Sequence, residues 1–279
     1  MRESAPRPTP PTAEADGRLV NRHRYGDGGA VHRYVADPYH RVRRELAIRM
    51  LLDGLRSDDD VGVAPAPDAT PNRDARNGRP VSRTPSTRVT GRPVLELGCG
   101  PVSMLADVPD PPWPAVVADL ALDVVVAARR PAVGALCLDA TRPFPLRTGT
   151  LAGVLMGELI EHVYDPLALL RECRRVLAPT GLLVLTTPNL AALQDRLTFL
   201  FGRAPRQVNP AHPYLWMHIR PFTVSLLGDV LRRAGLEPVR VRSNYVGWRM
   251  RGGRWVKSRT LARLLPGLGG SLVVAARPR

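Results

Sequence analysis

Two carboxylates and an imidazole lie close together in the stretch Glu158-Leu159-Ile160-Glu161-His162. In a helix, the 100° step per residue places the three polar side chains within one sector of about 100°, while the two apolar residues between them face the core. Oxygen and nitrogen ligands at positions i, i+3 and i+4 are well placed to hold one divalent cation. The spacing therefore indicates a metal site. The alternative is that the helix dipole alone favours two Glu residues in a first turn.

A glycine-rich turn at 94–102, with the sequence V-L-E-L-G-C-G-P-V, is the second group that could do chemistry. The apolar residues that open it are typical of a short buried strand. Gly98 and Gly100 let the backbone turn tightly and approach a ligand without an obstructing Cβ. In doubly wound α/β domains, a strand that runs into such a turn opens a nucleotide site. Glu96 would repel a pyrophosphate, so this strand end suits a ligand that carries an ammonium group.

Apolar runs and helical patterns alternate along 92–279, which predicts a doubly wound α/β fold around a mostly parallel sheet. After the strand at 94–97, we expect strands at 115–118, 135–138, 153–156, 181–186, 239–241 and 272–275. We expect helices at 120–129, from 166 to a turn at 178–181, and at 225–234 with a glycine C-cap. The helix after the glycine turn should be short, because four prolines lie between 109 and 114.

Acidic residues follow two of these strands on the edge where parallel sheets bind ligands. Asp119 ends the second strand about 20 residues past the glycine turn, where an acidic residue accepts the ribose hydroxyls of a nucleotide. The alternative is that Asp119 caps the helix that follows. Asp139 and Ala140 follow the third strand in the same way, so we expect the ligand to lie across these strand ends.

The composition indicates a globular protein and raises the question of whether its partner is a nucleic acid. The 279 residues are 44% hydrophobic, which supports a globular core, and carry a formal net charge of +15, which invites a nucleic-acid interpretation. However, Lys257 is the only lysine, and such a preference for arginine is typical of the codon bias of a GC-rich genome. The arginines are also scattered along the chain rather than gathered in one stripe. Nucleic acid therefore stays an alternative partner to a small molecule.

The three cysteines show no metal or redox spacing. Cys99, Cys137 and Cys173 form no C-x-x-C pair and lie in apolar segments. We therefore expect reduced thiols in the core.

Four segments are expected along the chain. The Pro-rich residues 1–24 are predicted to be a disordered tail, 25–56 an N-terminal helical cap that starts at Asp37-Pro38, 57–91 a flexible linker, and 92–279 the main domain. No signal-peptide apolar region is visible, and no run approaches the ~18 apolar residues that a membrane span needs. We therefore expect a cytoplasmic protein without a transmembrane segment.

The glycine turn and the strand ends resemble those of the class I S-adenosylmethionine (SAM)-dependent methyltransferases. The first motif of that family, E/D-x-G-x-G-x-G, is matched at Glu96, Gly98 and Gly100, while Val102 replaces the third glycine. The resemblance covers 92–276 and implies a Rossmann-like sheet of seven strands with an antiparallel last strand. It also implies that SAM is held by Glu96, Gly98, Cys99, Gly100, Asp119, Leu120, Asp139, Ala140 and Met156.

The pattern E-x-x-E-H, followed by the distant His218, resembles the metal site of the small-RNA 3′-terminal 2′-O-methyltransferases. The E-x-x-E-H part also resembles the quinone-pathway O-methyltransferases. In these families a cation holds vicinal hydroxyls of the acceptor, which implies Mg²⁺ or another divalent cation bound by Glu158, Glu161, His162 and His218. The same E-H pair also occurs in methyltransferases that bind no metal. The alternative is therefore that His162 or His218 acts alone as the general base.

These features together predict a SAM-dependent O-methyltransferase that acts on a small or medium hydroxylated acceptor. The resemblance also implies that the N-terminal helix lies over the SAM cleft, where Tyr34, Tyr39 or His40 could touch the ligand. The alternative is that these three residues lie on the surface without such a role. Residues 190–220 are the expected acceptor wall and lid, or else an ordinary amphipathic helix and loop.

Three other functions stay open. They are an RNA- or nucleotide-directed 2′-O-methyltransferase, a NAD-binding oxidoreductase and a non-catalytic SAM-binding protein. Glu96 and the lack of a clean G-x-G-x-x-G argue against the oxidoreductase. The sequence does not indicate the oligomeric state.

Overall fold

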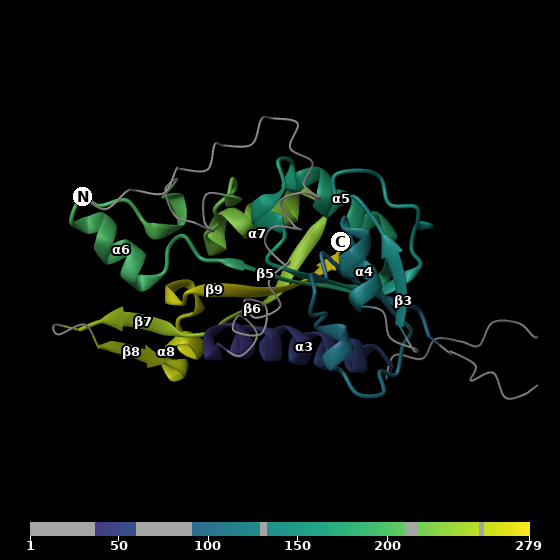
Figure 1. Ribbon diagram of the computed structural model, residues 1–279, viewed down its shortest axis with the longest axis horizontal. Helices are drawn as coiled ribbons and strands as arrows, with labels where there is room; N and C mark the ends of the chain where they lie inside the picture. The colour runs from purple at the N-terminus through teal and green to yellow at the C-terminus, as the bar shows by residue number, and fades with distance from the viewer. Residues whose placement is uncertain (1–36, 60–90, 129–132, 210–216, 251–253) are drawn as a thin grey trace, which may run out of the picture.

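A computed structural model describes residues 37–59, 91–128, 133–209, 217–250 and 254–279 (Figure 1). The tail predicted at 1–24 and most of the linker predicted at 57–91 lie outside the described residues, as does Tyr34. Among the described residues, no helix combines the length and the apolar character that crossing a membrane requires.

A seven-stranded sheet forms the centre of the fold. Its strands are β1 (Val94–Leu97), β2 (Ala115–Asp119), β3 (Val133–Cys137), β4 (Leu151–Gly157), β5 (Leu177–Pro188), β6 (Leu236–Ser243) and β9 (Ser271–Pro278). Their order across the sheet is β3-β2-β1-β4-β5-β9-β6. The strands from β3 to β5 pair in parallel, and β9 runs antiparallel to both of its neighbours. The predicted doubly wound sheet with an antiparallel last strand is confirmed.

The register explains why the ends of the first strands meet. All four residues of β1 are buried, as expected for a central strand of a sheet that is covered on both faces. Leu97 at the end of β1 pairs with Ala118 of β2 and with Met156 of β4. These three strands therefore end at one edge, which is the edge where doubly wound folds bind their ligands.

Helices cover both faces of the sheet. α3 (Pro38–Asp59) lies along one face and contacts β4, β5 and β9, whereas α5 (Pro166–Val176) and α7 (Val224–Arg233) pack together on the other (Figure 1). The contact of α3 with the sheet is close, since a Cβ on Gly54 would come within 2.4 Å of Leu182 Cδ2. The predicted N-terminal helix is therefore present, and it is packed onto the same sheet as the rest of the domain.

The helix predicted to end in a turn at 178–181 ends earlier, and these four residues bulge out of the pairing between β4 and β5. α5 ends at Val176, and β5 begins at once with Leu177, which pairs with Leu151 of β4. Pro179 cannot continue a helix, and the extended pairing starts before it. β5 is therefore longer than the strand predicted at 181–186.

The elements that follow β1 and β2 lie where the sequence predicts them. The segment after β1 contains only a single 3₁₀ turn, η1 (Leu105–Asp107), as the prolines predict, and α4 (Leu122–Ala128) lies within the helix predicted at 120–129.

Cys99 and Cys173 are buried, but Cys137 is exposed because β3 is an edge strand. The prediction of three core thiols is therefore wrong for Cys137.

The chain between β6 and β9 forms a small second sheet. β7 (Val246–Arg249) and β8 (Trp255–Ser258) pair as an antiparallel hairpin, which α8 (Arg259–Leu264) follows. α6 (Leu193–Leu200), which comes after β5, packs against β7. The hairpin and α6 both project from the end of the sheet at which β5 ends and β9 begins (Figure 1).

Candidate active site

The glycine turn has the conformation that the sequence predicts. Gly98 and Gly100 have φ angles of 69° and 58°, in the left-handed region that favours glycine. The amides of Gly98 and Cys99 both donate to the carbonyl of Ala118, at 2.8 and 3.1 Å, which ties the turn to the end of β2. A Cβ on Gly98 would lie 3.1 Å from Leu159 Cδ2. The turn therefore lies tightly between β2 and the segment after β4.

Glu96 shapes this turn through a carboxylate that is buried in the protein. Its Oε1 accepts from the amide of Met104 at 2.8 Å, and its Oε2 from the amide of Leu105 at 3.0 Å and from the hydroxyl of Ser103. Burial raises the pKa of Glu96, and these hydrogen bonds offset part of that rise. The oxygens of Glu96 thus hold the loop that follows the glycine turn.

Arg44 of α3 clamps the same loop from the other side. Its Nη1 donates to the carbonyl of Val102 at 2.8 Å, its Nη2 to the carbonyl of Ser103 at 3.1 Å, and the guanidinium also pairs with Asp107. The position at which the methyltransferase motif has its third glycine is therefore fixed by the N-terminal helix. Sequence reasoning missed Arg44, because nothing in a local pattern pairs residue 44 with residue 102.

Asp119 contacts backbone amides on both sides of the end of β2. Its Oδ2 accepts from the amide of Gly100 at 3.1 Å, and its Oδ1 accepts from the amide of Ala121 at 3.1 Å, just before α4. The side chain is buried at the end of β2. It therefore links the glycine turn to the start of the next helix.

The remaining residues expected to contact SAM lie along the same edge. Asp139 Oδ1 accepts from the amide and the hydroxyl of Thr141, at 2.9 and 2.7 Å. Met156 is buried at the end of β4, while Leu120 and Ala140 are half-buried. The structure thus brings the predicted cofactor residues to the ends of four neighbouring strands.

The helix expected from Glu158 to His162 is wrong. Only η2 (Ile160–His162), a single 3₁₀ turn, is present. The amide of Glu158 donates to the carbonyl of Thr186 at 3.0 Å, and Glu158 has a φ of 51°. A residue in the left-handed region does not belong to a right-handed helix. Glu158 therefore leaves the strand in a different direction from Glu161 and His162.

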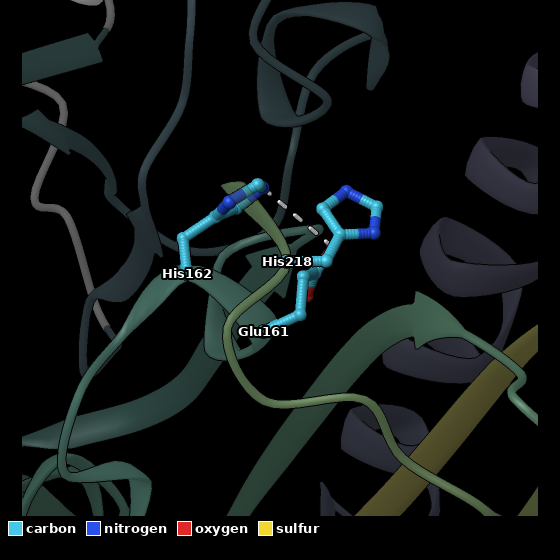
Figure 2. A group of neighbouring side chains, drawn as sticks. All are labelled: Glu161, His162 and His218. Atoms are coloured by element: carbon cyan, nitrogen blue, oxygen red, sulfur yellow. Dashed lines mark ion pairs between the residues drawn. The ribbon is translucent and has the colours of Figure 1, made fainter. Parts of the chain in front are cut away.

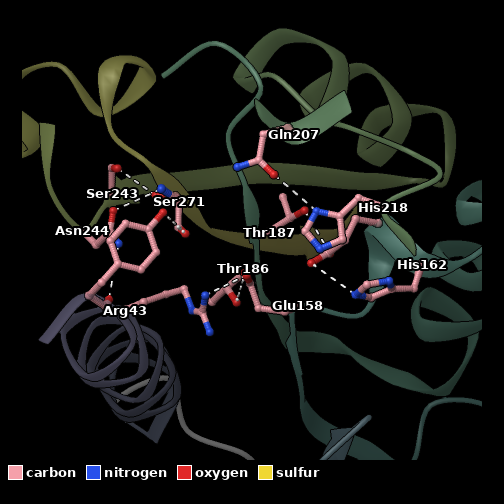
Figure 3. Close-up of polar contacts among 12 residues, drawn as sticks. Arg43, Glu158, His162, Thr186, Thr187, Gln207, His218, Ser243, Asn244 and Ser271 are labelled. Atoms are coloured by element: carbon pink, nitrogen blue, oxygen red, sulfur yellow. Dashed lines mark hydrogen bonds and ion pairs between the residues drawn. The ribbon is translucent and has the colours of Figure 1, made fainter. Parts of the chain in front are cut away.

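Glu158 faces the N-terminal helix. Its Oε2 lies 2.7 Å from Nη1 of Arg43, and its Oε1 accepts from the hydroxyl of Thr186 at 3.1 Å (Figure 3). Arg43 is 4% exposed and the Glu158 side chain 20%, so the guanidinium is desolvated while the carboxylate keeps some contact with solvent. The sequence carried a signal for Arg43, because it lies at helical spacing from the buried Ala47 and Met50. A charged residue in such a stripe indicates a buried partner.

Glu161 is the buried acid of the site, with 1% of its surface exposed. The hydroxyl of Thr187 donates to its Oε2 at 3.0 Å. Its Oε1 is buried too but has no hydrogen-bond partner within the described ranges, and His162 Nε2 lies 3.9 Å away. Burial, together with the charge of Glu158, raises the pKa of Glu161 well above its ordinary value. Because an unpartnered buried oxygen is costly, this atom is a candidate to hold a proton or a cation.

His162 and His218 complete the cluster (Figure 2). Nδ1 of His162 donates to the carbonyl of Met217 at 3.0 Å, and Nδ1 of His218 donates to Oε1 of Gln207 at 3.3 Å. With the proton on Nδ1, each neutral ring carries its lone pair on Nε2. The ring centroids are 4.9 Å apart. Glu161, His162 and His218 each offer one ligand atom, and these atoms all lie within 4.8 Å of one another.

Arg220 holds the segment that carries His218 against the segment that carries Glu161 and His162. The amide of Arg220 donates to the carbonyl of Glu161 at 3.1 Å, and its guanidinium lies 4.8 Å from the ring centroid of Tyr164. Gln207 belongs to η3 (Arg206–Val208) and is buried. Sequence reasoning found His218 by resemblance but missed Gln207, for which no local pattern exists.

Tyr39 and His40 of α3, which were expected to lie near SAM, contact other parts of the protein in the structure. The hydroxyl of Tyr39 lies 2.9 Å from Ser271 Oγ, so this half-buried side chain ties α3 to the start of β9. His40 is half-buried, and burial together with the charge of Arg43 lowers its pKa to about 4. His40 is therefore neutral near pH 7.

Comparison with known proteins identifies the domain. Residues 71–241 match a family model described as a methyltransferase domain. Over 156 residues the chain is 33% identical to a protein of Mycolicibacterium smegmatis described as a probable S-adenosylmethionine-dependent methyltransferase, with 54% of each chain covered. The match therefore spans about half the length of this curated relative.

One further curated protein matches a shorter stretch, and one solved structure is similar in fold. A ubiquinone biosynthesis O-methyltransferase of Cereibacter sphaeroides is 35% identical over 86 residues, which is 31% of this chain and 34% of that protein. The structure is similar to that of a SAM-dependent methyltransferase of Thermotoga maritima, with a TM-score of 0.53 and 15% identity, covering 93% of this chain and 99% of that one. This last likeness shows the fold alone.

The ion pair between Arg43 and Glu158 makes a stability prediction. We expect Arg43→Met to lower the free energy of unfolding by roughly 3–5 kcal/mol, because it leaves the Glu158 carboxylate without this buried counter-ion. The double variant Arg43→Met/Glu158→Gln should recover much of the loss. Chemical denaturation followed by circular dichroism measures both values. Arg49→Met, at an exposed position of the same helix, is the matched control. If Arg49→Met lowers the free energy of unfolding as much as Arg43→Met does, the role of the ion pair is refuted.

Proposed function

The chain belongs to the methyltransferase-domain family, and we propose that it transfers the methyl group of SAM to a hydroxyl of a small or medium acceptor. The observation that carries the proposal is the buried Oε1 of Glu161, which faces two histidines and has no hydrogen-bond partner in the described part of the chain. The cluster follows β4, at the edge where β1 and β2 also end. Relatives described as SAM-dependent methyltransferases support the choice of methyl donor.

We assign SAM to the edge formed by β1 to β4. Gly98 and Gly100 would let the backbone approach its amino-acid tail, Asp119 would accept its ribose hydroxyls, and Asp139 would lie beside its adenine. Glu96 acts indirectly in this proposal, because its oxygens already hold the loop amides. The resemblance of these residues to the methyltransferase motifs supports the assignment.

The donor set fits a divalent cation. One carboxylate oxygen and two imidazole nitrogens suit Mn²⁺, Zn²⁺ or Co²⁺ and also admit Mg²⁺. Metal-binding histidines usually donate their second ring N–H to a carbonyl, and Met217 and Gln207 provide such acceptors here. We therefore propose that Glu161, His162 and His218 hold the cation. When bound, a cation in this place would lower the pKa of an acceptor hydroxyl.

Glu158 has a different role in this proposal from the fourth ligand that the resemblance implies. Its carboxylate lies against Arg43, outside the group of three residues that offer closely spaced ligand atoms. The Arg43 guanidinium offsets its charge, which limits the repulsion between Glu158 and Glu161. Glu158 therefore supports the cluster and anchors α3 beside it.

Methyl transfer needs alignment and the loss of one proton. The acceptor oxygen bonds to the methyl carbon while the sulfonium S–C bond breaks, sulfur keeps the electron pair, and the hydroxyl proton leaves. The glycine turn and Asp119 would fix the donor. With a cation bound, the Nε2 lone pairs of His162 and His218 would be used as ligands, and the acidified hydroxyl would lose its proton to solvent. In the alternative without a cation, these Nε2 atoms can accept the proton.

A second candidate acceptor is the ribose at an RNA 3′ end. The net charge of +15 favours a phosphate-bearing partner, and a terminal ribose also offers neighbouring hydroxyls. Methyl-transfer assays with a catechol and with a short RNA, both followed by release of S-adenosylhomocysteine, distinguish the two acceptors.

The assignment of Asp119 predicts a loss of SAM affinity. We expect Asp119→Ala to weaken the binding of S-adenosylhomocysteine by ~1–3 kcal/mol, because two ribose hydroxyls lose their acceptor. Isothermal titration calorimetry measures the change. Asp123→Ala, at an exposed position of α4, is the control and should bind as the wild type does. Unchanged affinity in Asp119→Ala would remove this residue from the site.

The cation proposal predicts separate effects on the two binding events. Glu161→Gln should abolish the binding of Mn²⁺ to the full chain in calorimetry but leave the binding of S-adenosylhomocysteine nearly unchanged, because the two sets of contacts differ. Glu237→Gln, at a half-exposed position of β6, is the control and should keep Mn²⁺ binding. Because the cation must displace the proton that the raised pKa of Glu161 favours, Mn²⁺ affinity should fall as the pH is lowered.

Measurement of methyl transfer after chelation distinguishes the cation mechanism from a histidine base that acts alone. Chelation with EDTA should abolish methyl transfer if the cation orients the acceptor. Full activity after exhaustive chelation, with a decline as the pH falls through the histidine pKa near ~6.5, would instead establish a mechanism with a histidine base alone.

A further inference from the structure

Four large apolar side chains are exposed within five consecutive residues at the end of α6. Leu197, Phe199, Leu200 and Phe201, here called the α6 patch, are 43%, 70%, 75% and 78% exposed. Three of them are consecutive in the sequence, and two are the phenylalanines expected to line an acceptor wall. Single exposed apolar residues are common on protein surfaces, but several large ones close together in the chain can mark an interaction site.

The architecture presents the α6 patch at one extremity of the molecule. α6 projects from the end of the sheet together with the β7–β8 hairpin (Figure 1). Gly202, with a φ of 71°, turns the chain back directly after Phe201. Asp195 then ties the returning segment to α6, because its Oδ1 accepts from the amide of Arg206 at 3.3 Å. The patch is therefore the tip of a closed, anchored projection.

The charge around the α6 patch has one sign at the surface. Arg196, Arg203 and Arg206 are exposed, whereas Asp195, the only acidic residue in 189–209, is buried. The neighbouring hairpin has the same character, since no Asp or Glu occurs between 238 and 279. An apolar tip flanked by exposed arginines is complementary to a surface that is apolar inside and anionic outside.

We propose that the α6 patch docks this protein onto anionic lipid membranes. The side chains of Leu197, Phe199, Leu200 and Phe201 would enter the interface between headgroups and acyl chains, while the surrounding arginines contact lipid phosphates. Aliphatic side chains beside the aromatic ones favour lipid over RNA, because RNA is held by stacking on aromatic rings. Four side chains at a tip also cover far less area than the ~800 Å² per partner that a stable dimer buries.

Docking at this tip would bring the site close to the membrane. Gln207 lies in the segment that returns from the α6 patch and contacts His218 through its side chain. The proposal goes beyond the proposed methyl transfer and does not depend on it, because the docking surface shares no residue with the cluster.

Vesicle binding tests the proposal with the full chain. Sucrose-loaded vesicles of phosphatidylcholine with about one third phosphatidylglycerol are sedimented with the protein, and the bound fraction gives a partition coefficient. We expect the wild type to sediment with them. Phe199→Ser/Phe201→Ser keeps the net charge and should lower the partition coefficient by roughly tenfold or more, because both rings lose their place in the interface.

A matched control separates the patch from the general positive charge. Leu122 and Val126 on α4 are 62% and 63% exposed, so Leu122→Ser/Val126→Ser removes a similar exposed apolar area elsewhere. This variant should bind vesicles as the wild type does. Circular dichroism should show the same fold for both double variants.

Three results would overturn the proposal. The first is a wild type that does not bind the vesicles or a patch variant that binds them equally well. The second is loss of binding to a single-stranded RNA oligonucleotide in the patch variant with vesicle binding unchanged, which would assign the patch to RNA. The third is a wild-type dimer in light scattering that becomes a monomer in the patch variant, which would assign it to a second copy of the chain.

Discussion

The candidate site depends on the buried carboxylate of Glu161. Only one of its oxygens receives a hydrogen bond, from Thr187, and the other has no such partner among the described residues. In a low-dielectric interior an unpaired carboxylate oxygen is costly, and a proton or a cation on the second oxygen would remove that cost. The orientation of His162 and His218, each fixed by a hydrogen bond at Nδ1, places two lone-pair nitrogens near that oxygen.

The N-terminal helix is part of this arrangement and not only a cover over it. Arg43 pairs with the second carboxylate, Glu158, and Arg44 holds the carbonyls of the loop after the glycine turn. Tyr39 contacts Ser271 and thereby fixes the same helix to β9. Three side chains within two turns of α3 thus connect the loop that we assign to SAM with the cluster that we assign to a cation.

Much of the fold could be predicted from the sequence, because apolar runs and turn residues are local signals. The glycine turn, the strand ends and the antiparallel last strand follow from them and from the resemblance. The direction of Glu158 could not be predicted, since its left-handed conformation depends on pairing with Thr186, which is remote in the sequence. Gln207 and Arg44 act through equally long-range contacts, which no periodicity reveals.

A crystal structure with S-adenosylhomocysteine and Mn²⁺ tests the central claim most directly, through the anomalous scattering of the metal. Our account predicts one anomalous peak at about 2.0–2.3 Å from Glu161 Oε1 and from Nε2 of His162 and His218, beside the bound nucleoside. An anomalous map without a peak at the cluster, in crystals where the nucleoside is bound and Glu161 Oε1 is hydrogen-bonded to water or to an acceptor, would contradict it.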